Sequence, residues 1–194
     1  MAKKLLFPLA ALAFFPIAGL AQASSVDPAL LAKATAGDPA AQVAAGEAYA
    51  KTAGATDDRE VAADAWKQSA AWYKKAAEQA YLPGVIHLAD AYSYGRGVER
   101  DKVKAAELYR KAAGQGDPNA QATLAMLYSL GQGVPQDYAE SYFWFDLAAQ
   151  VKTPNQDRYI ANRQNVGTHI TIDQLEEVQQ RLKKWKAAHP RPTP

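Results

Sequence analysis

Two stretches of the sequence, 88-LADAYSYGRGVERDKVKAAELYRKAA-113 and 124-LAMLYSLGQGVPQDYAESYFWFDLAA-149, are copies of one pattern. A shift of 36 residues superimposes their Leu-Ala and Tyr-Ser pairs, their Gly-x-Gly-Val segments, one aspartate and the closing Ala-Ala. An earlier, looser copy keeps Trp72-Tyr73 and Ala76-Ala77 in phase but has seven more residues between its halves, in the polar run 52–60. Self-similarity at a fixed period of this size indicates a repeat architecture.

Each copy predicts two helices joined by a glycine turn. Residues 83–94 place apolar side chains at spacings of three and four, which builds one apolar helix face. Gly95 follows at a position typical of a helix stop, and Asp101 is typical of the N-cap that opens a second helix over 101–113. Because one hairpin buries only one of its sides, successive hairpins are expected to stack into a helical solenoid.

The residues from Leu88 to Val134 resemble the Sel1-like repeat, an αα-hairpin repeat related to the tetratricopeptide repeat. The family pattern has a Leu-Gly or Leu-Ala pair, an aromatic residue, a Gly-x-Gly-Val turn, an aspartate, a second aromatic residue, Ala-Ala and a closing Gln-Gly. The resemblance covers roughly residues 36–186 and implies an all-α, right-handed α-solenoid with a C-terminal capping helix. We expect one domain over 24–188, with repeats at about 37–79, 80–115 and 116–151 and a cap at 156–188. The first copy departs from the pattern, since a longer loop over 54–60 replaces its turn glycines.

The two ends of the chain differ from the repeats. Lys3-Lys4, an apolar run over 5–20 and the sequence Ala21-Gln22-Ala23 predict a signal peptide, residues 1–23, that is cleaved after Ala23. An uncleaved membrane anchor is the alternative, but the run is short for a span and contains two prolines. We therefore expect a periplasmic protein with no membrane insertion after cleavage. Residues 28–35 and 171–188 predict terminal helices, and the proline-rich segment 189–194 predicts a flexible tail.

Composition argues against several classes of site. Without Lys3 and Lys4 the 22 basic residues become 20, which match the 20 acidic residues, so the chain has no charge excess that favours nucleic acid. The sequence has no cysteine, which excludes disulfides, thiol catalysis and cysteine–metal sites. Its histidines, His87, His169 and His189, form no pair at metal-ligand spacing. We expect no metal, no cofactor and a monomer.

One segment, 91-AYSYG-95, resembles the nucleophile elbow of hydrolases. Ser129 recurs at the same position one period later, which favours a structural role in the repeat over a catalytic one. The aromatic residues Trp66, Trp72 and 142–144 are interpreted mostly as hairpin core. Four consecutive aromatic residues over 142–145 exceed one helix face, so one or two of them are candidates for partner contact.

A partner is expected on the concave side of the solenoid, which the first helices of successive hairpins line. The resemblance implies that Sel1-like arrays hold other proteins or peptides there. Candidate recognition residues occupy positions that change from copy to copy: His87, Asp90, Tyr94, Thr123, Met126 and Leu130, with Glu47 and Lys51 as the first-copy equivalents of Asp90 and Tyr94. The alternative for each is an ordinary solvated side chain, and Met126 and Leu130 are favoured because they are apolar where other copies are polar.

The leading hypothesis is a non-catalytic periplasmic module that binds another protein as a scaffold, a regulator or an immunity-type inhibitor. The resemblance implies these roles because the family includes all three. The alternative is a cell-wall or β-lactam binding protein or hydrolase, a role linked to some relatives. Those relatives tend to be rich in cysteine, and this chain has none, which weakens the alternative.

Overall fold

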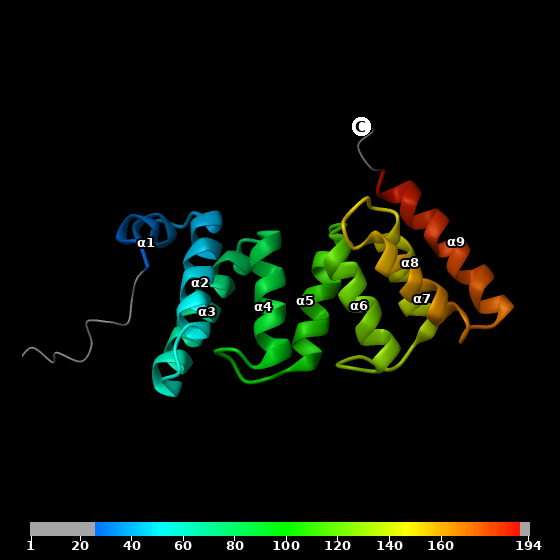
Figure 1. The fold of residues 1–194 in the computed structure, drawn as a ribbon. Helices are drawn as coiled ribbons and strands as arrows, with labels where there is room; N and C mark the ends of the chain where they lie inside the picture. The colour runs from blue at the N-terminus through cyan, green and yellow to red at the C-terminus, as the bar shows by residue number, and fades with distance from the viewer. Residues whose placement is uncertain (1–25, 191–194) are drawn as a thin grey trace, which may run out of the picture.

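The computed structural model describes residues 26–190, and all regular secondary structure in that range is helical (Figure 1). The predicted signal peptide and the last four residues of the predicted tail lie outside the described residues. The described helices, in chain order, are α1 (Pro28–Thr35), α2 (Pro39–Gly54), α3 (Arg59–Glu78), α4 (Leu82–Tyr94), α5 (Lys102–Gly114), α6 (Pro118–Leu130), α7 (Tyr138–Ala149), α8 (Gln156–Gly167) and α9 (Ile172–Ala188).

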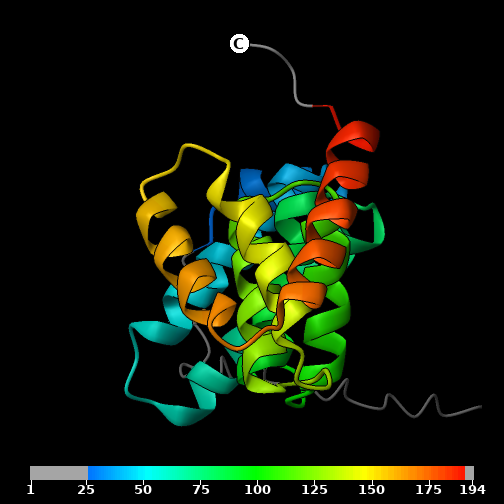
Figure 2. The same cartoon turned by 90° about the vertical axis from the view of Figure 1, so that its right-hand side faces the viewer.

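These helices pack as consecutive hairpins. α2 pairs with α3, α4 with α5 and α6 with α7, and each hairpin contacts the next through α3–α4 and α5–α6. α1 packs on α2 at one end, and α8 and α9 both pack on α7 at the other, where Figure 2 shows them on either side of it. The prediction of an all-helical solenoid of hairpins is confirmed.

Several helices begin or end at capping residues that the sequence predicts. Aspartate is the N-cap residue of six helices, α1, α2, α3, α5, α6 and α7, and in each its side chain accepts hydrogen bonds from backbone N–H groups of the first turn. Gly95 and Gly131 end α4 and α6 in the left-handed conformation, at φ values of 71° and 62°. The capping box that opens α9 forms both of its hydrogen bonds, between Thr171 and Gln174.

The second glycine of each Gly-x-Gly turn lies against the preceding hairpin. A Cβ atom on Gly97 would stand 2.0 Å from the carbonyl oxygen of Trp66, and one on Gly133 would stand 2.0 Å from that of Lys102. Both glycines also have positive φ values, 73° and 74°. Only glycine allows the turn to approach the backbone of the second helix this closely, so the motif serves the stacking of hairpins.

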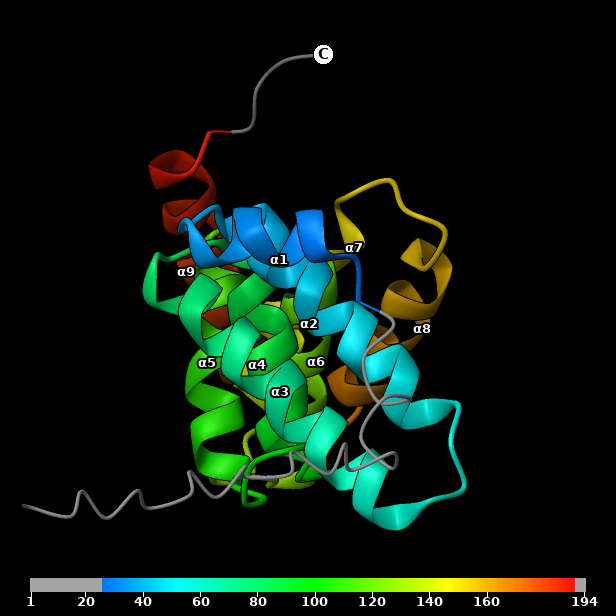
Figure 3. The same cartoon turned by 90° about the vertical axis from the view of Figure 1, so that its left-hand side faces the viewer.

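The insertion in the first copy is mostly helical, which corrects the expectation of a longer loop over 54–60. α2 runs to Gly54 and α3 begins at Arg59, so residues 55–58 alone connect them, whereas residues 95–101 connect α4 to α5. The period of 36 residues aligns the start of α5 with Trp66, so α3 starts seven residues early, about two turns. The α2–α3 hairpin is therefore the longest, and its connecting end projects from the stack (Figure 3).

The main core lies in the second and third hairpins and the C-terminal cap. Leu124 and Phe145 are fully buried there, and Phe143 and Trp144 are buried beside them, which confirms the aromatic run as core; Tyr142 is half-buried. Trp185 of α9 packs edge-on against Trp144 with ring centroids 5.5 Å apart. His189, which we expected in the tail, stacks on the Trp185 ring at 4.0 Å.

No helix between residues 26 and 190 is both long and apolar enough to span a membrane.

Candidate functional site

Two of the predicted recognition residues meet at the boundary between the first and second hairpins. His87 of α4 stacks on the Tyr73 ring of α3, with ring centroids 4.7 Å apart and an interplanar angle of 17°. Its Nε2 atom lies 3.3 Å from the Oε1 atom of Glu47 on α2. The His87 side chain therefore joins three helices from two hairpins.

Asp90 lies one turn further along α4 and accepts a hydrogen bond from the Tyr109 hydroxyl of α5. Burial raises the pKa of the Tyr109 phenol, and the hydrogen bond to the Asp90 carboxylate raises it further because the neutral phenol is the donor. Burial also raises the pKa of Tyr73, and the negative charges of Glu47 and Asp90 add to that shift. The carboxylates of Glu47 and Asp90 thus both act on the Tyr73 phenol at this boundary.

His87 and Asp90 line a cavity of about 220 Å³ between the hairpins. Its walls combine aromatic, charged and small side chains, and its other lining residues are Ala50, Trp66, Ser69, Tyr73, Ala91 and Arg96. This volume lies below the roughly 300–1,000 Å³ of sites that enclose a drug-sized ligand. The cavity is of a size for a single side chain or a comparably small group.

Tyr94 lies at the edge of this site, with 65% of its surface exposed. The Arg96 guanidinium is 5.0 Å from the centroid of the Tyr94 ring and 4.9 Å from that of the Trp66 ring. Such distances allow cation–π attraction to both rings. Arg96 therefore links the turn of the second hairpin to α3 of the first hairpin.

The three remaining predicted residues lie on α6 and do not reach the cavity. Thr123 is half-buried, while Met126 and Leu130 are exposed to 47% and 58%. They occupy the repeat positions of His87, Asp90 and Tyr94. We name these six residues of α4 and α6 the first-helix face. It borders a polar cavity between the first and second hairpins and has exposed apolar side chains on the third hairpin.

The cavity walls are not a requirement of the repeat. A shift of 36 residues replaces Trp66 by Lys102, Ser69 by Ala105, His87 by Thr123, Asp90 by Met126 and Arg96 by Gln132, whereas Tyr73 stays tyrosine at 109. The contact between the Trp66 and Arg96 positions persists with different chemistry, because the Lys102 ammonium donates to Oε1 of Gln132 at 2.9 Å. Several side chains that differ between copies therefore line the same cavity.

Sequence reasoning missed several residues of this site. It interpreted Trp66 as core, and it did not single out Ser69, Tyr73 or Arg96. The sequence did contain a signal for three of them. Trp66, Ser69 and Arg96 differ from Lys102, Ala105 and Gln132, the residues one period later. What the period alone does not reveal is that these positions on α3 and the following turn face His87 and Asp90.

Between residues 26 and 190 no three His, Asp or Glu side chains gather into a group able to hold a metal ion. The Ser129 hydroxyl, which shares the repeat position of Ser93 in the elbow-like segment, donates to the carbonyl of Met126 within α6. The site offers aromatic surface, the half-buried carboxylate of Asp90 and the imidazole of His87.

Comparison with known proteins agrees with this architecture. Residues 67–81, 84–117 and 118–150 match the Sel1 repeat. A search of curated protein sequences finds no match.

Several solved structures are similar to this chain. The protective antigen c5321 of uropathogenic Escherichia coli, which displays an SLR fold, is 25% identical with a TM-score of 0.57, over 81% of this chain and 40% of that protein. A Sel1 repeat protein from Oxalobacter formigenes is 26% identical with a TM-score of 0.56, over 69% of this chain and 96% of that protein. The chain thus spans well under half of the E. coli protein. Cysteine-rich protein B of Helicobacter pylori is 21% identical with a TM-score of 0.45, which is too distant to inform function.

Proposed function

We propose that this chain is an exported, non-catalytic Sel1 repeat protein that binds another protein through its first-helix face. Sel1 repeat proteins are generally protein-interaction modules. The roles open to this one are scaffold, regulator and immunity-type inhibitor in the bacterial envelope. The proposed periplasmic location rests on the leader-like sequence at residues 1–23.

One observation carries the proposal: the side chains of the first-helix face differ from one copy to the next, and two of them are exposed apolar residues. Positions that hold the hairpins together keep their identity, such as Leu88 and Leu124, or Ala112 and Ala148. Positions on the first-helix face change, and in the third hairpin they are the exposed apolar residues Met126 and Leu130. Exposed apolar side chains on α6, together with a polar cavity beside α4, suit a protein partner, since interfaces combine an apolar centre with polar contacts.

The test is capture of partners from the envelope fraction of the native cell by the tagged chain. We expect one dominant protein to be enriched by the natural sequence and lost with Met126→Glu/Leu130→Glu. Val103→Glu is the matched control, because Val103 is also an exposed apolar residue, at 56%, but lies on α5 outside the first-helix face. Circular dichroism must show that all variants remain helical.

The same experiment can reject the proposal. If the Met126→Glu/Leu130→Glu variant captures the same proteins as the natural sequence, the first-helix face is not the binding surface. If Val103→Glu loses the captured protein to the same extent as Met126→Glu/Leu130→Glu, the capture depends on exposed apolar surface in general and not on the first-helix face.

A further inference from the structure

The helical insertion of the first hairpin builds a second cavity, of about 540 Å³, outside the first-helix face. Arg59, Ala62 and Ala63 form part of its wall, and all three belong to the seven residues by which α3 starts earlier than the period predicts. The turn between α4 and α5 supplies the opposite wall through Gly95, Gly97, Val98 and Glu99. The regular repeat does not create this space, because α5 starts at the position aligned with Trp66.

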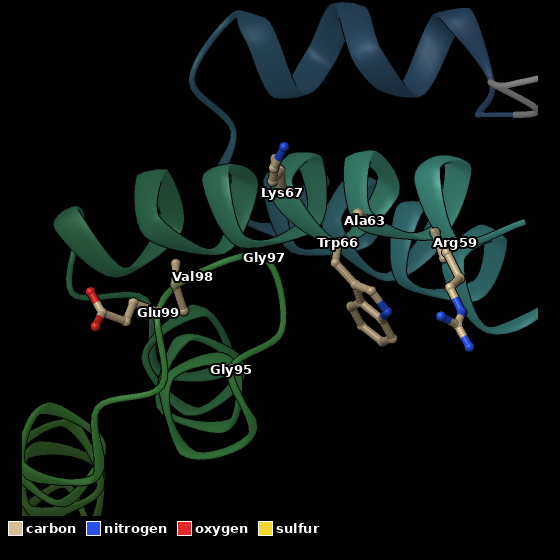
Figure 4. A pocket seen from close by; sticks show the side chains of 9 residues that line it. Arg59, Ala63, Trp66, Lys67, Gly95, Gly97, Val98 and Glu99 are labelled. Atoms are coloured by element: carbon tan, nitrogen blue, oxygen red, sulfur yellow. The ribbon is translucent and has the colours of Figure 1, made fainter.

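The centre of the cavity is apolar. The Trp66 side chain projects from α3, and Val98 lies on the turn (Figure 4). Ala62 and Ala63 are the other apolar lining residues of α3. Trp66 also lines the smaller cavity beside His87, so its ring stands between the two sites. A half-buried tryptophan in a hollow is the kind of residue that dominates binding energy at protein interfaces.

One end of the cavity carries the guanidinium group of Arg59. Arg59 extends from α3 on the same side as Trp66, and Glu99 lies at the other end on the turn (Figure 4). Arg59 and Arg96 form no ion pair with any residue of the described range 26–190, and Arg96 lies over the Trp66 ring. Lys67 is different, because its ammonium lies 3.4 Å from the carboxylate of Asp64. Arg59 is thus a lining residue of this cavity whose guanidinium has no ion-pair partner in the described range.

We propose that this cavity docks a segment of a partner protein in which an apolar side chain is next to an acidic one. The apolar side chain packs on Trp66 between Ala62, Ala63 and Val98. The carboxylate meets Arg59, whose planar guanidinium suits bidentate recognition of a carboxylate. The inference goes beyond the first-helix face, since it assigns binding to a separate surface that the insertion creates.

The experiment selects peptides from a displayed library of short random sequences on the immobilised chain. Enriched peptides are synthesised, and their dissociation constants are measured by fluorescence anisotropy. We expect the enriched peptides to combine Asp or Glu with a neighbouring large apolar residue. We also expect Arg59→Glu to weaken binding about tenfold, the equivalent of about 1.4 kcal/mol. Replacing the acidic residue of the peptide by its amide should weaken binding to the natural sequence similarly.

The variants are chosen so that the fold survives. Arg59 is the first residue of α3, where an acidic side chain interacts favourably with the helix dipole, so Arg59→Glu should not unfold the helix. Ala63→Glu is a second variant, since Ala63 is exposed and the change places a negative charge beside the indole. Lys74→Glu is the matched control, because it reverses a charge on an exposed residue of the same helix outside the cavity.

The outcomes separate this inference from the proposed function. Binding that survives Met126→Glu/Leu130→Glu but is lost with Arg59→Glu and Ala63→Glu supports the second docking site, whatever the fate of the first-helix face. The inference is overturned if no peptides are enriched, if the enriched peptides lack acidic residues, or if Arg59→Glu and Ala63→Glu bind like Lys74→Glu.

Discussion

Ala80 is a residue in a conformation that its side chain disfavours. It follows α3 with a φ value of 56°, and the equivalent positions before α2 and α6 are Gly37 and Gly116, at 101° and 90°. A left-handed conformation costs an L-residue with a Cβ atom about 1–2 kcal/mol. The second copy of the pattern, which begins at Ala80, therefore carries strain that the first and third copies avoid with Gly37 and Gly116.

This comparison predicts opposite effects for two exchanges. Ala80→Gly should raise the free energy of unfolding by about 0.5–1 kcal/mol, because relief of strain exceeds the extra chain entropy of glycine. Gly116→Ala should lower it by about 1 kcal/mol through backbone strain alone, since a Cβ atom at Gly116 would meet no other atom within 4 Å. Urea denaturation measures the free energy of unfolding of both variants. If both substitutions change it in the same direction, the strain argument is wrong.

Asp90 and Tyr109 form a pair that the third hairpin replaces by Met126 and Phe145. Hydrogen bonds to charged groups contribute about 1.5–3 kcal/mol, so we expect Tyr109→Phe to destabilise the fold by about 2 kcal/mol. In an Asp90→Met background, which copies the third hairpin, the same change should cost much less. A double-mutant cycle followed by urea unfolding measures this coupling, and strictly additive effects would show that the pair makes no energetic contribution.

The same residues show what the sequence could and could not predict. The period of 36 residues placed His87, Asp90 and Tyr94 on one helix face and Thr123, Met126 and Leu130 on the next. It contained no information about which of these six side chains border a cavity. That depends on the ring of Tyr73 and on the reach of Arg96 from the turn, both of which belong to other elements. Their use in recognition stays a prediction.

At the level of elements, a pair of glutamines ties α2 to the end of α3. The side-chain amide of Gln42 donates to the carbonyl of Ala34, and its own oxygen accepts from the Gln79 amide at 2.9 Å. In the third hairpin, Gln121 makes the matching bond to the carbonyl of Ala113. Its Oε1 atom, however, is buried without a hydrogen-bond partner in the described structure, because Val151 occupies the position of Gln79.

We therefore expect Val151→Gln to stabilise the third hairpin by about 1 kcal/mol, since it supplies a donor for a buried acceptor. The control is the same substitution in a Gln121→Val background, which copies Val85 at the equivalent position of the second hairpin and leaves no acceptor to satisfy. Thermal unfolding of the four chains measures the effect. If Val151→Gln raises the stability equally in both backgrounds, the gain does not come from a hydrogen bond to Gln121.

The insertion is the element that sequence reasoning placed correctly and described wrongly. Its polar residues, among them Asp57, Asp58 and Glu60, are typical of loops. The structure uses Asp58 as a helix cap and continues into alanines, which favour helix. Loop composition and the exposed first turn of a helix are similar in polarity, so composition alone does not separate them.

At the scale of the whole molecule, the core is uneven from one end to the other. The largest continuous cluster spans α4 to α9 and includes Leu124, Phe145 and Tyr159. The first hairpin is held by smaller clusters, in which Val43 and Tyr73 pack with Leu88, and alanines of α1 and α2 pack together. Because repeat proteins are stabilised mainly by neighbouring units, this gradient should be visible as a gradient of local stability.

We predict that α1–α3 open before α6 and α7. Hydrogen exchange followed by mass spectrometry should show faster exchange in α1–α3, because less apolar surface is buried there and local openings cost less than global unfolding. Val43→Ala should accelerate exchange in α1–α3 and leave α6 and α7 nearly unchanged. Leu124→Ala, at a fully buried position of the main core, should cost about 2–5 kcal/mol and accelerate exchange throughout the chain. Uniform protection from α2 to α7, or a global response to Val43→Ala, would mean that the chain opens as one cooperative unit despite its uneven core.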